Sequence, residues 1–196
     1  MRILFPVAFA LAAFAAPAAA GPYEEGLQLG ERQDYRGAMA AFRRAAEGGN
    51  AAAMRHVGFL HYDGKGVAQD TQQAVAWFAR AGEAGDLKAQ SDLAFMYETG
   101  TSVAPDPAKS AYWARKAAEG GDRSSQFRLG IFYVLGQGVE KDRIEGVKWM
   151  RIAFRHDDAW TRGARRNAEI AEEKMTAEQV AEAHRRAAEW MRQHPR

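Results

Sequence analysis

A hydrolase needs a nucleophile, and serine is the candidate here because the 196-residue chain contains no cysteine. The serines occur at positions 91, 102, 110, 124 and 125. None lies in a G-x-S-x-G turn, and none is followed three residues later by the lysine of an S-x-x-K motif. The sequence therefore predicts no serine acylation and no catalytic residue.

The histidines and acidic residues do not form a metal-binding pattern. No two of the five histidines have the i, i+4 spacing that places two ligands on one helix face, and H-E-x-x-H is absent. The adjacent pairs Asp157-Asp158 and Glu172-Glu173 diverge around a helix. The glycines around Lys65 lack the remainder of a phosphate-binding loop. We therefore predict no metal, no cofactor and no enzymatic activity.

The first twenty residues have the pattern of an export signal. Arg2 precedes an apolar run, residues 3–16, and small residues end the segment in an A-x-A cleavage site. A retained anchor is the alternative, but Pro17 breaks the run before the ~20 residues that a membrane span requires. We predict signal-peptide cleavage after Ala20, a periplasmic or secreted mature protein starting at Gly21, and no later membrane span.

The charge balance argues against a nucleic-acid partner. Lys and Arg number 27 and Asp and Glu 25, so loss of Arg2 with the signal leaves 26 minus 25, or +1. The arginine pairs at 43–44, 165–166 and 185–186 lie among glutamates, which favours solvated helix faces over a phosphate-binding patch. Without cysteine, helix packing must supply all the stability in an oxidising compartment.

Three segments of 36 residues, 51–86, 87–122 and 123–158, align without a gap and are called units one, two and three below. Six positions are identical in all three units. They are Gly64, Gly100 and Gly136; Val67, Val103 and Val139; Asp70, Asp106 and Asp142; Trp77, Trp113 and Trp149; Ala81, Ala117 and Ala153; Asp86, Asp122 and Asp158. We infer that one unit folds in one way three times.

Each unit is predicted to contain two helices joined by a fixed turn. Ala53, Val57 and Leu60 recur at helical spacing in the first half of unit one. Gly64 suits the left-handed position that ends this helix, and Asp70 suits the N-cap of the next. The turn valine is expected to plug the gap between the helices.

Other positions predict how the helices pack. Small residues at 58, 94 and 130 allow two helices to approach closely, and the tryptophans are interpreted as core residues rather than as a ladder for carbohydrate stacking. Asp142 with Glu145 predicts a capping box.

Shorter elements flank the three units. Residues 21–50 repeat the second-helix pattern, with Asp34 at the N-cap, and predict an N-terminal tetratricopeptide-like unit. Residues 159–196 predict two capping helices, the second starting at a capping box of Thr176 and Gln179. The stripe that this last helix would bury comprises Val180, Ala183, Ala187, Trp190 and Met191. The predicted fold is all-α, a right-handed α-solenoid of stacked helix-turn-helix repeats.

The repeat pattern A-x-x-x-[LV]-[GA]-x-x-[YH]-x-x-G-x-[GS]-V-x-x-D-x-x-x-x-x-x-W-x-x-x-[AG] resembles that of the Sel-one-like repeat family, relatives of the tetratricopeptide repeat. The resemblance covers nearly all of the chain after the signal. It implies an adaptor that binds proteins, with no shared chemistry. Ser102 departs from the family's second loop glycine, and His61 from the tyrosine seen at Tyr97 and Tyr133.

Some cysteine-rich, β-lactamase-like relatives give an alternative function. On that reading the protein is a cell-envelope enzyme or regulatory subunit acting on peptidoglycan. Both the cysteines and a serine-lysine pair are missing here, so no catalytic site supports it.

The first helices are expected to line a concave groove, because solenoid curvature produces such a surface. Positions 55, 56, 59 and 63 and their equivalents vary in charge and size, as a ligand-specific surface would, and also as an unconstrained surface would. Tyr97 and Tyr133 are suited to binding, but packing within their own units is the alternative. The predicted partner is a protein or peptide of the bacterial envelope. The candidate partner-binding residues are Arg55, His56, His61, Asp92, Tyr97, Arg128 and Tyr133.

Overall fold

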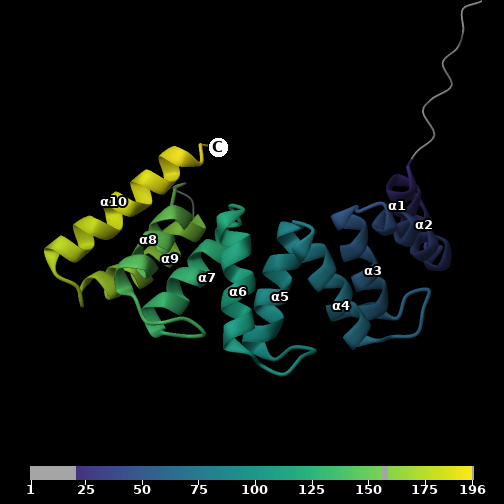
Figure 1. Cartoon of the computed structure of the whole chain (residues 1–196), viewed down its shortest axis with the longest axis horizontal. Coiled ribbons are helices and arrows are strands. Elements are labelled where there is room, and N and C mark those ends of the chain that lie inside the picture. The colour runs from purple at the N-terminus through teal and green to yellow at the C-terminus, as the bar shows by residue number, and fades with distance from the viewer. Residues whose placement is uncertain (1–20, 156–158, 196) are drawn as a thin grey trace, which may run out of the picture.

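The computed structural model describes residues 21–155 and 159–195, and these form ten helices and no strand. The helices follow one another along an elongated molecule, with α1 and α10 at opposite ends (Figure 1). The predicted all-α solenoid is confirmed. The end of unit three, with His156 and the pair Asp157-Asp158, lies outside the described residues. The helices are α1 (Pro22–Glu31), α2 (Tyr35–Glu47), α3 (Ala51–Asp63), α4 (Thr71–Glu83), α5 (Leu87–Thr99), α6 (Pro107–Glu119), α7 (Arg123–Leu135), α8 (Arg143–Ala153), α9 (Ala159–Glu172) and α10 (Ala177–Gln193).

The turn inside each unit has the same hydrogen bonds three times. The first helices, α3, α5 and α7, end at a glycine with a positive φ of 68°, 76° or 77°. The N-cap aspartates accept from the backbone N–H three residues later, at 2.9, 3.0 and 3.0 Å. Their own N–H groups donate to the carbonyls of His61, Tyr97 and Tyr133. Both ends of the turn are thereby fixed.

One of the two predicted capping boxes forms completely. Thr176 and Gln179 exchange both hydrogen bonds at the start of α10. The prediction for Asp142 and Glu145 was wrong in its second half. The N–H of Asp142 already donates to Tyr133, and the Glu145 carboxylate pairs with Lys148 instead.

The turns also join neighbouring units. Gly138 has a φ of +68°, and a Cβ there would overlap the backbone carbonyl of Pro107, at the start of α6 in the preceding unit. Gly66 approaches the backbone of Tyr35 in the same way. Ser102 adopts the equivalent conformation, with a φ of 72°, although it carries a side chain. The turns of units one and three are therefore in close contact with the helix pair that precedes each of them.

The predicted close approach of paired helices is present. A Cβ on Gly58 would lie 2.7 Å from the ring of Phe78, and one on Gly130 would lie 2.8 Å from the carbonyl oxygen of Gly146. In unit two the Ser110 hydroxyl donates to the carbonyl of Ala94 at 2.8 Å. Small side chains therefore set the separation of all three helix pairs.

Two of the three aligned tryptophans are core residues. Trp113 and Trp149 are 6% and 4% exposed. The ring of Trp113 lies over Gly82 of the preceding unit, and that of Trp149 is covered by Trp190 of α10, with 5.6 Å between ring centroids. The core prediction was only partly right for Trp77, which is half-buried. The Arg80 guanidinium lies 4.0 Å from the ring centre of Trp77 and covers it.

The last two helices close the C-terminal end. α10 packs against α8 (Figure 1). Ala183 and Ala187 are buried and Val180, Trp190 and Met191 are half-buried, much as the apolar stripe predicts. α9 buries Ala164, Ala168 and Ala171. Among the described helices, none is both long and apolar enough to cross a membrane.

Candidate functional site

Two candidate residues of α3, Arg55 and His56, are engaged within the solenoid. The Arg55 Nε donates to the Asp86 carboxylate at 3.1 Å, and the two side chains are only 14% and 10% exposed. Since Asp86 caps α5, this contact joins units one and two. The His56 ring stacks on Phe42, with 4.7 Å between centroids. Burial, and then the Arg55 charge, lower the pKa of His56.

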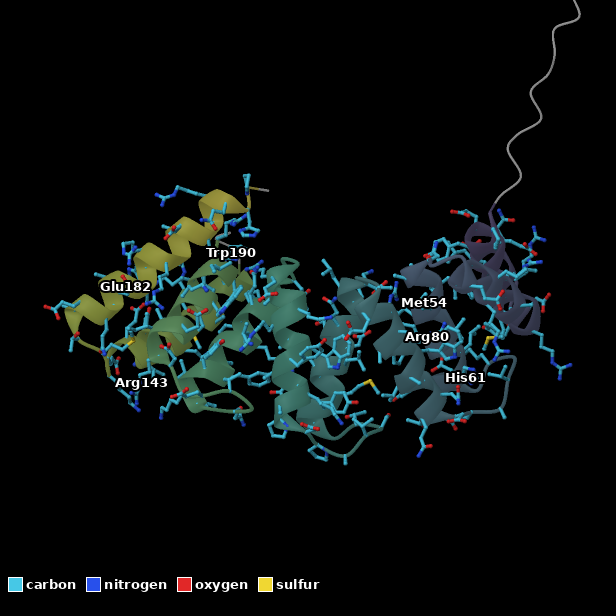
Figure 2. All side chains as sticks on the ribbon, viewed as in Figure 1. Met54, His61, Arg80, Arg143, Glu182 and Trp190 are labelled. Carbon is cyan, nitrogen blue, oxygen red and sulfur yellow. The ribbon has the colours of Figure 1, made fainter. Side chains whose placement is uncertain are left out.

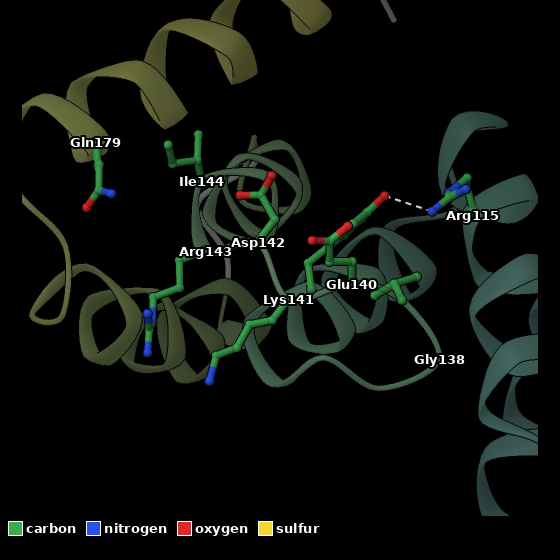
Figure 3. Close-up of a pocket in the computed structure, with 10 residues that line it drawn as sticks. Arg115, Gly138, Glu140, Lys141, Asp142, Arg143, Ile144 and Gln179 are labelled. Atoms are coloured by element: carbon green, nitrogen blue, oxygen red, sulfur yellow. Dashed lines mark hydrogen bonds between the residues drawn. The ribbon is translucent and has the colours of Figure 1, made fainter.

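The row of His61, Tyr97 and Tyr133 packs within the units. His61 is buried on α3 (Figure 2). Tyr133 accepts a hydrogen bond from the guanidinium of Arg115 at 2.7 Å, drawn as the dashed line in Figure 3. The Lys109 ammonium lies 5.3 Å from the ring centre of Tyr97. A binding role for this row stays a prediction, and its members contribute to packing.

Arg43 holds the same place beside His61 that Arg115 holds beside Tyr133, because both pairs are 18 residues apart in equivalent units. The Arg43 contact is longer, at 3.5 Å from the His61 Nε2, and the buried Nδ1 has no partner among the described residues. Burial, and then the Arg43 charge, lower the pKa of His61. The folded state therefore resists protonation of this ring.

We expect His61→Tyr to raise the free energy of unfolding by about 1 kcal/mol at pH 7.5, because the phenol would accept from Arg43 and leave no orphaned nitrogen. The folded pKa of His61 is lowered, so below about pH 6.5 the unfolded chain binds more protons and the wild type loses stability. The advantage of the variant should therefore grow at pH 5.5. Urea titrations at both pH values measure this, and an equal gap at both would contradict the role of His61.

Asp92 and Arg128 occupy equivalent positions but different environments. Arg128 forms an ion pair with Glu98 and lies 5.5 Å from the ring centre of Phe95. Burial lowers its pKa. Asp92 is half-buried on α5 and has no hydrogen bond or ion pair from its side chain within the described residues. Asp92 is consequently the better probe of binding, since Arg128 also packs.

The sequence reasoning missed an apolar row on the first helices. Position 59 and its equivalents, grouped above with freely varying positions, hold Phe59, Phe95 and Ile131. Phe59 and Phe95 are 37% and 48% exposed, and both line a hollow between α3 and α5. Ile131 lines the corresponding hollow beside α7, with exposed Leu135 and Ile170. Comparing all three units at this position would have revealed the pattern. We call this surface the first-helix face.

A larger hollow, of about 840 Å³, lies beside the turn of unit three (Figure 3). Arg115, Tyr133 and Gln179 border it, together with charged residues of the turn, residues 140–143. These charges alternate in sign along the chain. Within the described parts of the chain, no three acidic or histidine side chains gather where they could hold a metal ion. The arrangement provides polar and charged contacts around the hollow.

The turns repeat the same hydrogen bonds in three units while the first-helix positions vary between units, as in a repeat protein. The Sel1 repeat model matches residues 18–50, 51–86, 87–122 and 123–158. This chain belongs to the Sel1 repeat family. This match confirms the family resemblance predicted from the sequence. Sel1 repeat proteins are helical scaffolds for protein interaction.

Solved structures support the same family. A Sel1 repeat protein from Oxalobacter formigenes is 29% identical, with a TM-score of 0.59 over 66% of this chain and 95% of its own. The protein c5321 displays an SLR fold and is a protective antigen present in uropathogenic Escherichia coli strains. It is 25% identical, with a TM-score of 0.50 over 87% of this chain. This Sel1 repeat protein spans only 45% of the length of c5321. No curated protein matches it.

Proposed function

We propose that this Sel1 repeat protein is an exported adaptor that holds a protein or peptide of the bacterial envelope against its first-helix face. The observation that carries the proposal is the row of Phe59, Phe95 and Ile131, which places large apolar side chains at one position in three successive units. Phe59 and Phe95 contact Phe78 and Arg128 but keep 37% and 48% of their surface exposed. Contiguous exposed apolar patches are typical of interaction sites. The repeat spacing extends this patch along the molecule.

Partner capture with matched variants tests the proposal. Phe95 on α5 and Tyr112 on α6 are aromatic residues of nearly equal exposure, 48% and 46%, on different helices of unit two. We expect Phe95→Ser to reduce the recovery of a specific envelope protein about tenfold, as loss of an interface aromatic typically does, and Tyr112→Ser to leave it unchanged. Thermal denaturation of both variants checks that they remain folded.

Equal recovery with both variants would place the partner elsewhere. Loss with Tyr112→Ser alone would assign binding to the second helices, α4, α6 and α8. If the wild type is retained by peptidoglycan and captures no protein, the cell-wall alternative replaces the adaptor. Nothing in the described structure favours that alternative over the adaptor.

Export is the second part of the proposal. Cleavage after Ala20 would leave α1 whole, since this helix begins at Pro22 with Gly21 at its N-cap. We expect the protein recovered from the soluble envelope fraction to have the mass of residues 21–196, because the A-x-A site ends at Ala20. Intact-mass measurement tests this, and a species that retains Met1 in that fraction would contradict it.

A further inference from the structure

A narrow apolar hollow lies between α3 and α5 on the first-helix face. Phe59 and Tyr62 line one side, Phe95 and Met96 line the other, and Phe78 of α4 lies beneath Phe59, with 4.9 Å between ring centroids. Its volume is about 220 Å³. Small-molecule sites usually measure ~300–1,000 Å³, so this hollow has room for one or two partner side chains rather than a whole ligand.

Asp92 adds a carboxylate to the lining of this hollow. Arg128 occupies the position equivalent to Asp92 in unit three, and Arg55 precedes the equivalent position in unit one. Both already form ion pairs, Arg55 with Asp86 and Arg128 with Glu98. Lys88 lies one helical turn before Asp92 and makes no ion pair with it. Since a half-buried carboxylate without a partner is unfavourable, the hollow offers a negative charge that an incoming cation would satisfy.

The electrostatic surroundings of Asp92 agree with this geometry. Burial raises the pKa of the Asp92 carboxyl, and the charges of Asp86 and Asp122 raise it further, against the lowering effect of Arg55 and Lys88. A cation placed beside Asp92 would compensate for the cost of burying the carboxylate and would offset the repulsion from Asp86 and Asp122.

The acidic group also occurs in only one unit. The residues equivalent to Asp92 are His56 in unit one and Arg128 in unit three. An apolar row repeats along the first-helix face, but the carboxylate marks a single place on it. Asp92 would therefore fix the register of a bound segment.

We propose that the hollow between α3 and α5 binds a peptide segment in which a large apolar side chain stands beside a lysine or arginine. The apolar side chain enters between Phe59 and Phe95, and the cation pairs with Asp92. The proposal rests on the adaptor function proposed above and names the chemistry of its partner.

Selection from a phage-displayed library of random dodecapeptides tests the proposal on the mature chain, residues 21–196. We expect the wild type to enrich peptides with a large apolar residue within a few positions of lysine or arginine. Asp92→Asn should keep the apolar preference and lose the basic one. Glu119→Gln is the matched control, because it removes an exposed carboxylate at the end of α6.

Affinities measured with a synthetic copy of the best wild-type peptide give the magnitudes. We expect Asp92→Asn to weaken binding on the order of fivefold, as for a partly exposed ion pair, and Phe95→Ser on the order of tenfold. Glu119→Gln should leave the affinity unchanged. Asp92→Asn is nearly isosteric, and a melting curve for each variant separates lost binding from lost folding.

Four results would overturn the proposal. If Asp92→Asn kept the preference for basic peptides, Asp92 would have no role in binding. If Phe95→Ser nevertheless abolished selection, the first-helix face would still be the binding surface, but the proposed pairing of a cation with Asp92 would be wrong. If neither variant had an effect, the first-helix face itself would be wrong. Failure to enrich any peptide would exclude a peptide site. A wild-type dimer in sedimentation that Phe95→Ser converts to a monomer would show that a second copy occupies the hollow.

Discussion

Trp113→Ala is expected to lower the free energy of unfolding by about 3–5 kcal/mol, the usual cost of truncating a buried tryptophan. The ring is 6% exposed and lies over Gly82, where it closes the interface between units one and two. Because units of a solenoid contact mainly their neighbours, weakening this central interface should also broaden or split the unfolding transition. Urea denaturation followed by circular dichroism measures both effects.

Arg115→Ala is the matched control, two residues along the same helix. Arg115 is exposed, and its hydrogen bond to Tyr133 and its contact with that ring are surface interactions. We expect this variant to lose no more than about 1 kcal/mol. Similar denaturation midpoints for the two variants would show that Trp113 is not part of the core.

Gly138→Ala is expected to cost at least about 3 kcal/mol, from two sources that add. The backbone at Gly138 has a φ of +68°, which disfavours any side chain, and the new methyl group would overlap the carbonyl of Pro107 in the preceding unit. The turn of unit three would have to move away from α6. Thermal and urea denaturation give the magnitude.

Gly85→Ala separates these two sources. Gly85 also has a positive φ, of +93°, but a Cβ there meets nothing within 4 Å. We expect a loss of about 1–2 kcal/mol, the conformational cost alone. If Gly138→Ala cost no more than Gly85→Ala, the close contact between the turn and α6 would not contribute to stability.

The sequence predicted the helices and turns well because their signals are local. The glycine that ends α3 and the aspartate that caps α4 act through hydrogen bonds spanning a few residues, and the same residues recur in all three units. The incomplete capping box at Asp142 shows the limit of such signals. Its N–H is taken by the carbonyl of Tyr133, nine residues earlier, which the S/T/D-x-x-E spacing does not reveal.

The sequence could not predict which candidate side chains are already engaged within the solenoid, because the availability of a side chain depends on residues far along the chain. Arg55 and Asp86 are 31 residues apart, and their contact turns a candidate binding residue into part of an interface between units. Arg128 likewise pairs with Glu98, 30 residues away, while Asp92 has no such contact. These outcomes follow from how neighbouring units stack.

The sequence alone determined the repeat, the family, the helix ends and most of the core, because these depend on periodic apolar residues and on local backbone preferences that every copy repeats. Only the tertiary structure decided which polar side chains of the first helices are already paired and which apolar ones stay exposed. Stacking brings together residues about one unit apart, so Phe59 and Phe95 form one hollow with Asp92 within it. Periodicity along the chain predicts which residues share a face, but pairing across units decides which of them remain free to bind.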